Sequence, residues 1–225
     1  MAGVIRAPRK TFAAVAAAPR WAGVLLATTL ITFACSAVLL QTDVGRLALL
    51  DQWERTAIAF GGTVDDARYA QLMDLSRQGI TYAAISAVTS GPVLTFALAA
   101  VLLIVTRTLL RKAATFQQVL AIVAHAGVIL ALRQIVATPL NYVSETLASP
   151  TTLVRFAGAL DESSPIARFL GVVDLFVIWW IVVLAIGMAS LAGVRARPLA
   201  LAFTGAYVVL ALLMATVMAL SGGIA

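Results

Sequence analysis

Residues 170–192 have the sequence LGVVDLFVIWWIVVLAIGMASLA, and this stretch decides the fold class. It holds a single charged residue, Asp174, and a helix of this length crosses a hydrocarbon core of roughly 30 Å at about 1.5 Å per residue. Similar apolar runs lie at 21–40, 83–106, 119–138 and 199–220. The sequence therefore predicts an all-α integral membrane protein with five transmembrane helices, forming a single membrane domain over residues 1–225.

The composition excludes an ordinary soluble domain. Hydrophobic residues make up 62% of the chain and charged residues only 12%, which would expose far too much apolar surface to water. The formal charge of +6 sits in short clusters beside the spans, where anionic lipid headgroups attract Lys and Arg. A lipid bilayer therefore accounts for the charge without a nucleic-acid partner. Because Cys35 is the only cysteine, no intramolecular disulfide is expected.

The charged residues are also sorted by loop. Segments 1–20, 107–118 and 193–198 carry nine basic residues and no acid, whereas 41–82 and 140–169 carry nine of the ten acids. The positive-inside rule then predicts a cytoplasmic N-terminus and an extracytoplasmic C-terminus. Segments 41–82 and 140–169 become the two external loops, and a bacterial inner membrane is the expected location.

Both external loops contain helix signals. Apolar residues recur at helical spacing from Val44 to Phe60, and Thr63 with Asp66 has the form of a capping box, so two short helices are expected in the first loop. Ser149-Pro150 and Ser164-Pro165 each predict an N-cap followed by a first-turn proline in the second loop. The second of these would start the fourth helix before the membrane.

Two prolines mark the spans themselves. Pro139 is expected to end the third span, because a proline removes a backbone donor. Pro92 is expected to kink the second span or to delay its start.

Polar residues inside the spans are the candidate site. Arg133 lies six residues before Pro139, where the third span is expected to end, and Asp174 lies four residues after the outer end of the fourth span. Their depths therefore match and an ion pair is predicted. The alternatives are that Arg133 extends to outer headgroups and that Asp174 simply reaches the interface. His125 lies on loosely the same face as Arg133 and would be either a polar relay or a helix-packing hydrogen-bond partner.

Small residues are spaced for close helix approach, either within the chain or in an oligomer. They recur every four residues at Ala83, Ala87 and Gly91, and again at Ala185, Ala189 and Gly193. The sequence contains no glycine-rich phosphate loop, HExxH, CxxC or GxSxG motif. Neither an enzyme nor a cofactor or metal site is therefore expected.

Three motifs resemble those of a known family. They are Pro8–Phe12 with Pro19 before the first span, Thr115–Leu120 opening the third, and a D-x-F-x-x-W signature of Asp174, Phe176 and Trp179, followed by Gly187. In these pieces the chain resembles a short bacterial member of the YIP family, the Ypt/Rab-interacting membrane proteins, which have five spans and the same topology. The resemblance implies a scaffold or accessory role, with bacterial relatives associated with ABC exporters. The long cytosolic N-terminal region and DLYGP-type motif of eukaryotic relatives are missing, so GTPase binding is not carried over.

Two functions follow as hypotheses. The leading one is a non-enzymatic scaffold or accessory protein of a bacterial inner-membrane complex, which binds another membrane protein or a second copy of itself. The rival is a small secondary transporter or channel that uses His125, Arg133 and Asp174.

Overall fold

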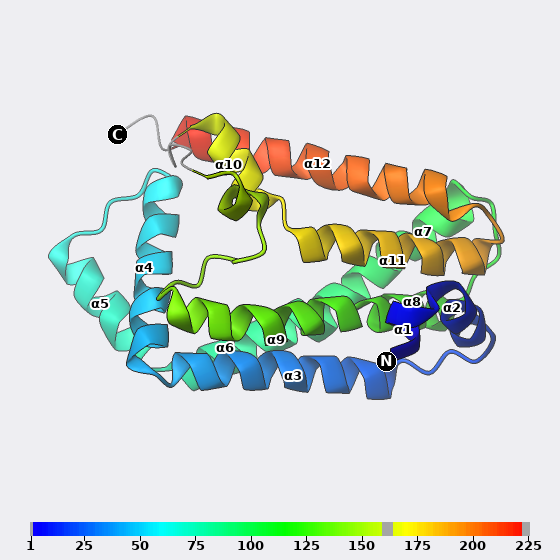
Figure 1. Ribbon diagram of the computed structural model, residues 1–225, viewed down its shortest axis with the longest axis horizontal. Coiled ribbons are helices and arrows are strands. Elements are labelled where there is room, and N and C mark those ends of the chain that lie inside the picture. The colour runs from blue at the N-terminus through cyan, green and yellow to red at the C-terminus, as the bar shows by residue number, and fades with distance from the viewer. Residues whose placement is uncertain (1, 159–163, 222–225) are drawn as a thin grey trace. The chain divides into compact units, whose positions relative to one another are not determined.

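A computed structural model describes residues 2–158 and 164–221 (Figure 1). Within these residues the chain is built from helices and their connections. Five helical segments are long and apolar enough to cross a membrane: Ala22–Leu40, Gly79–Thr108, Phe116–Val143, Leu175–Ala192 and Ala196–Val217. The chain is therefore a multi-pass helical membrane protein, as the sequence predicts.

The chain forms two compact units. Unit 1 comprises Met1–Phe33, Ile85–Gln134 and Phe176–Ala206, and unit 2 comprises Ala34–Ala84, Ile135–Leu175 and Tyr207–Ala225. Several long helices, such as α3 (Ala22–Leu40) and α9 (Val128–Val143), contribute residues to both units. The prediction of a single functional domain stays a prediction.

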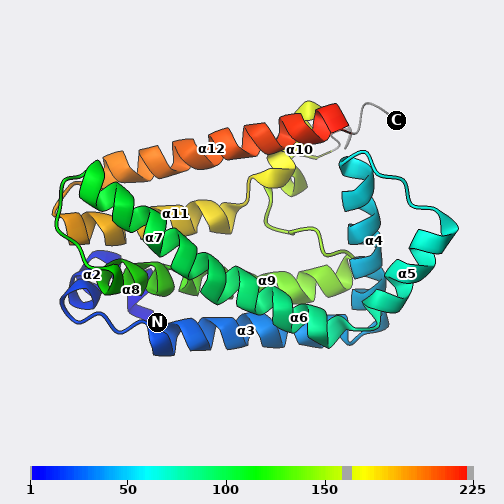
Figure 2. The ribbon, with the colours of Figure 1, turned by 180° about the vertical axis from the view of Figure 1, so that it is seen from behind.

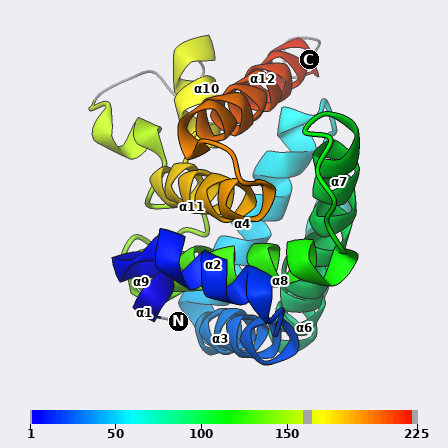
Figure 3. The same ribbon diagram turned by 90° about the vertical axis from the view of Figure 1, so that its right-hand side faces the viewer.

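The core of unit 1 is built around α8 (Phe116–Ala126). Every residue from Val119 to Ala124 is buried, which is the pattern of a helix enclosed on all sides. Helix α7 (Leu94–Thr108) packs against α8 (Figure 2), and α2 (Pro8–Ala17) lies along it (Figure 3). The short helix α1 (Ala2–Arg6) contacts α2 and buries Val4.

The first turn of α8 explains one of the quoted motifs. Thr115 caps the helix and forms a capping box with Gln118. The Gln118 side chain also donates from Nε2 to the carbonyl of Ala16, 3.2 Å away in α2. The same capping box therefore begins α8 and, through Gln118, joins α2 to it.

Helix α2 is anchored by an aromatic side chain as well. Phe12 is fully buried, and a Cβ placed on Gly187 of α11 (Leu175–Ala192) would lie 3.0 Å from its Cδ1 and 2.5 Å from Ile122 Cγ2. Only glycine leaves this space for the ring. The apolar face of α2, with Phe12 and Val15, is therefore packed into unit 1.

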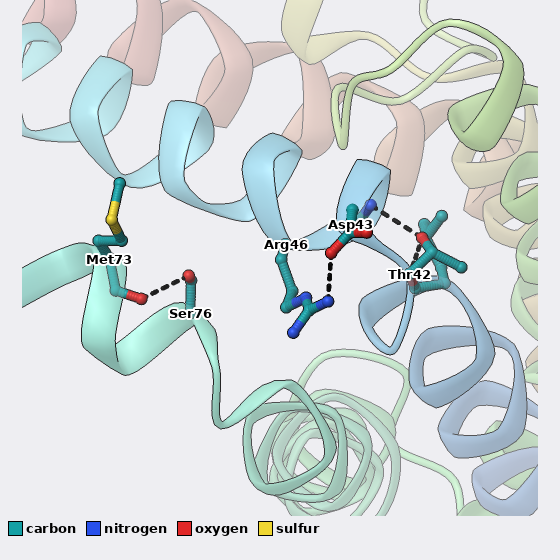
Figure 4. Close-up of polar contacts among 7 residues, drawn as sticks. Thr42, Asp43, Arg46, Met73 and Ser76 are labelled. Atoms are coloured by element: carbon teal, nitrogen blue, oxygen red, sulfur yellow. Dashed lines mark hydrogen bonds and ion pairs between the residues drawn. The ribbon is translucent and has the colours of Figure 1, made fainter.

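Unit 2 contains α4 (Asp43–Ala59), α5 (Asp66–Ser76) and the first part of α6 (Gly79–Val88), up to Ala84. Thr42 caps α4 by accepting from the Gly45 N–H at 3.0 Å, and Arg46 pairs with Asp43 in the first turn (Figure 4). A Cβ on Gly45 would lie 2.0 Å from the Leu39 carbonyl oxygen, so the corner between α3 and α4 requires glycine there.

The two helices expected between residues 44 and 76 are present, but one cap differs. The N-cap of α5 is Asp65, whose side chain accepts from the Arg68 N–H at 2.8 Å. The predicted Thr63 capping box is therefore wrong, because an aspartate two residues later reaches the same free amides. Ser164 does cap α10 (Pro165–Val172), as predicted.

Ser149-Pro150 does not start an α-helix. A turn and the short 3-10 helix η2 (Leu153–Phe156) follow it, and the Ser149 hydroxyl bonds other side chains instead. The prediction that Ser149 caps a helix that begins at Pro150 is therefore wrong.

Helix ends also differ from the apolar runs. Pro139 lies inside α9, which continues to Val143, so the expectation that it ends the third span is wrong. The backbone bond from the Ser144 N–H to the Leu140 carbonyl shows that helical bonding continues beyond the proline to the end of α9. At Pro92 the second span neither stops nor restarts but passes through a π-helical turn, η1 (Thr89–Val93).

Candidate functional site

Asp174 lies at a break in the fourth predicted span. Helix α10 ends at Val172 and α11 begins at Leu175, so the continuous helix expected over 170–192 is wrong. Asp174 occupies the position before the first residue of α11, where aspartate is a favoured N-cap and where the helix dipole favours a negative charge. The residue is 3% exposed, so this carboxylate is placed in the protein interior.

The break is stabilised because backbone groups that it frees find partners outside the two helices. The Val173 carbonyl accepts from the Leu153 N–H at 2.8 Å, and the Leu175 N–H donates to the Thr151 carbonyl at 3.0 Å. These two bonds form a single antiparallel bridge between Thr152 and Asp174. The segment after Ser149 therefore serves as a short strand-like partner for the break.

One tyrosine satisfies two more backbone groups at the break. The hydroxyl of Tyr207, in α12 (Ala196–Ser221), donates to the Val172 carbonyl at 2.7 Å and accepts from the Asp174 N–H at 3.1 Å. Its single oxygen thus bridges the two ends of the break. The sequence carries no local signal for this contact, because Tyr207 lies 33 residues from Asp174.

Two hydroxyls hold the carboxylate itself. Ser149 Oγ donates to Asp174 Oδ2 at 2.6 Å and Thr151 Oγ1 donates to the same atom at 2.7 Å. Both distances lie in the range that hydroxyl donors take toward a carboxyl oxygen. We call the set of Ser149, Thr151, Asp174 and Tyr207 the Asp174 junction; it fastens three segments of unit 2 together.

The predicted ion pair between Arg133 and Asp174 stays a prediction. Arg133 belongs to unit 1 and Asp174 to unit 2. The depth argument for the pair changes, because α9 runs ten residues beyond Arg133, or about 15 Å of helix rise, instead of six. Matching depths therefore no longer follow from the helix ends.

His125 makes a bond within its own helix. Its Nδ1 lies 2.7 Å from the Ala121 carbonyl oxygen in α8. It also lines a shallow groove of about 560 Å³ in unit 1, together with Lys10 and Arg20. The predicted relay through His125, Arg133 and Asp174 stays untested.

The small residues pack inside the chain with one exception. Ala83, Ala87, Ala185 and Ala189 are each at most 4% exposed, and a Cβ on Gly91 would lie 2.8 Å from Thr29 Oγ1. These residues are enclosed by their own chain, so their side chains are not free to meet a partner.

Gly193 does not belong to a packing face. It follows the last residue of α11 with a φ of +64°, and the Val194 N–H bonds back to the Ala189 carbonyl at 3.1 Å. This is a helix-ending motif that glycine favours, because the left-handed conformation strains other residues.

The remaining signature residues form an aromatic pair. The rings of Phe176 and Trp179, one turn apart in α11, lie 5.8 Å apart. The family profile of the Yip1 domain matches residues 2–218. The chain belongs to the Yip1 domain family. No curated protein and no solved structure matches it with significance.

Within this Yip1-family chain, the three quoted motifs coincide with structural joints. Phe12 packs against Gly187 and anchors α2, Thr115 caps α8, and Asp174 accepts hydrogen bonds at the break before α11. The hydroxyl partners of Asp174 were missed by sequence reasoning. The one available signal was a cluster of serine and threonine at 149–152, in the loop between α9 and α10.

Proposed function

We propose that this Yip1-family protein is a non-enzymatic scaffold or accessory protein of a bacterial inner-membrane complex. An ABC-type exporter is the candidate complex. One observation carries the proposal: the polar side chains in and beside the spans hold the chain's own backbone and side chains. His125 bonds Ala121, and Asp174 bonds two hydroxyls at a helix break. A transport site needs instead a titratable group that changes its access between the two sides.

Two helices offer apolar faces to the bilayer or to a partner. Helix α12 exposes Leu201 and Leu210 (66% and 60%), and α7 exposes Val101 and Ile104 (55% and 61%). Inside a membrane such faces bind lipid or another helix, and packing decides between them. The partner in this proposal is a membrane protein of the same bilayer, or a second copy of this chain.

Site-specific photo-crosslinking in living cells tests the proposal. A photoreactive residue is placed at Leu210 on α12 and, in a second variant, at Ile104 on α7. We expect a discrete adduct with a membrane protein at one of the two positions, and we expect deletion of this chain to reduce assembly of that partner's complex.

Purified protein in liposomes supplies the control. An adduct that persists there at twice the chain mass identifies a homo-oligomer, and one that disappears identifies a different partner. Lipid adducts alone at both positions in cells would contradict the scaffold proposal.

A transporter is the second candidate, because His125 lines a groove with Lys10 and Arg20 and is therefore not sealed within the core. We expect purified protein in proteoliposomes to be as impermeable to protons and ions as empty vesicles, with His125→Gln and Asp174→Asn unchanged. A saturable flux through the wild-type protein alone, abolished by His125→Gln, would replace the scaffold proposal.

A further inference from the structure

Unit 1 is cationic throughout. It contains ten of the sixteen basic residues and none of the ten acidic ones, all of which belong to unit 2. The positive charges of unit 1 therefore have no carboxylate in their own unit. Whatever neutralises them comes from outside unit 1.

Three of these charges line one groove. Arg9 of α2, Arg195 of the connection between α11 and α12, and Arg197 in the first turn of α12 line a groove of about 450 Å³. Figure 3 shows α2 and this connection on the side facing the viewer. The rest of the lining is one hydroxyl and small or apolar side chains: Ser190, Ile186, Ala189, Val194 and Ala196.

The groove has a polar mouth and an apolar floor. Arg195 and Arg197 follow the end of the α11 span at Ala192, which puts their side chains at headgroup level. Ile186 lies six residues inside that end, or about 9 Å of helix rise into the hydrocarbon layer. The lining therefore changes from cationic to apolar in the same direction as a phospholipid does.

The three arginines are not neutralised by any acid in the part of the chain that the structure describes. All three are exposed. Like charges that share a groove repel each other, so an anion between them is stabilised. A guanidinium binds the oxygens of a phosphate with two parallel hydrogen bonds, which makes phosphate the best-matched anion.

We propose that this groove binds an anionic glycerophospholipid, with its phosphate between Arg9, Arg195 and Arg197 and an acyl chain along the half-buried Ile186. A free phosphate would satisfy the arginines alone. The apolar floor gives a lipid a second set of contacts, so the lipid binds more tightly than its headgroup. The Ser190 side chain, at the border between the two regions, is at the level of the glycerol oxygens.

The test uses the full-length protein in a neutral detergent, where single lipids bind without a surrounding charged bilayer. Binding of dioleoyl-phosphatidylglycerol, dioleoyl-phosphatidylcholine and inorganic phosphate is measured by native mass spectrometry. The variant Arg9→Gln/Arg195→Gln/Arg197→Gln removes the groove charges. A matched control, Arg6→Gln/Arg111→Gln/Lys112→Gln, removes three exposed charges of unit 1 that do not line the groove.

The groove variant is expected to lose affinity for phosphatidylglycerol by about 100-fold, from roughly fivefold per arginine near a membrane surface. The affinity of the control variant for phosphatidylglycerol is expected to fall by less than about fivefold, because charges farther than a Debye length from the bound headgroup are screened. Wild-type protein should prefer phosphatidylglycerol to phosphatidylcholine, and millimolar inorganic phosphate should not displace the lipid.

Three results would overturn the proposal. Equal losses in the groove variant and the control would show general charge attraction instead of a site. Equal binding of phosphatidylcholine would remove the role of headgroup charge, and displacement by inorganic phosphate would assign the groove to the free ion. Should the triple variant unfold, Arg195→Gln alone, expected to weaken binding about fivefold, decides the question.

Discussion

The Asp174 junction depends on one hydroxyl, so Tyr207→Phe is a sharp test of it. The substitution keeps the ring and removes only the oxygen that bridges Val172 and Asp174. Both backbone groups then lose the hydroxyl that bonds them. Tyr142→Phe is the matched control, since Tyr142 is 50% exposed.

The size of the effect follows from the two groups. Each buried polar group left without a partner costs about 1–3 kcal/mol, so Tyr207→Phe should lower the free energy of unfolding by about 2–6 kcal/mol. A value near the lower end means that water reaches the break and replaces the hydroxyl. The control should stay within about 0.5 kcal/mol of wild type, as substitutions of exposed groups usually do.

Unfolding of the purified protein in micelles with an increasing SDS fraction measures this difference. Amide hydrogen exchange then locates it, because the peptide that contains residues 172–175 should exchange faster in Tyr207→Phe alone. The reasoning fails if Tyr207→Phe matches wild type in both measurements, or if the two tyrosine variants lose stability equally.

Three further predictions concern topology, the α3–α4 corner and the ion pair. The loop charges predict that a C-terminal reporter that is active only outside the cytoplasm gives a signal, and that segment 44–78 is labelled from outside the cell. A signal from a C-terminal reporter that is active only in the cytoplasm would refute the topology. Gly45→Ala should destabilise the protein by about 2 kcal/mol or more, because its Cβ would overlap a backbone carbonyl that has no room to move. The control Gly23→Ala, with nothing within 4 Å, should be neutral or stabilising in the same melts. The free energies of unfolding of Arg133→Leu, Asp174→Leu and the double variant are measured in detergent. We expect a coupling energy above about 1 kcal/mol between the two positions, and additive losses would show that the two side chains do not interact.

The spans were predictable because hydropathy is a local property. Twenty consecutive apolar residues need no knowledge of their neighbours to be assigned to a membrane, and all five runs are found as apolar helices. Short-range signals for helix starts were also informative: Ser164 caps α10 directly before a proline.

The same local rules failed where another part of the chain supplies a partner. Pro139 was expected to stop a helix that continues, and the run 170–192 was expected to be unbroken. In both cases the sequence shows the propensity of a residue, while the outcome depends on whether each freed backbone group finds a partner.

The sequence by itself determined the membrane class, the five spans and the sorting of charges, because these follow from runs and clusters along the chain. Only the tertiary structure decided what the polar residues do. It joined Asp174 to Ser149, Thr151 and Tyr207, which lie 25, 23 and 33 residues away in the chain. It also brought Arg9 to Arg195 and Arg197. The physical reason is that burial makes hydrogen-bond and charge compensation obligatory, and the compensating groups need only be near in space.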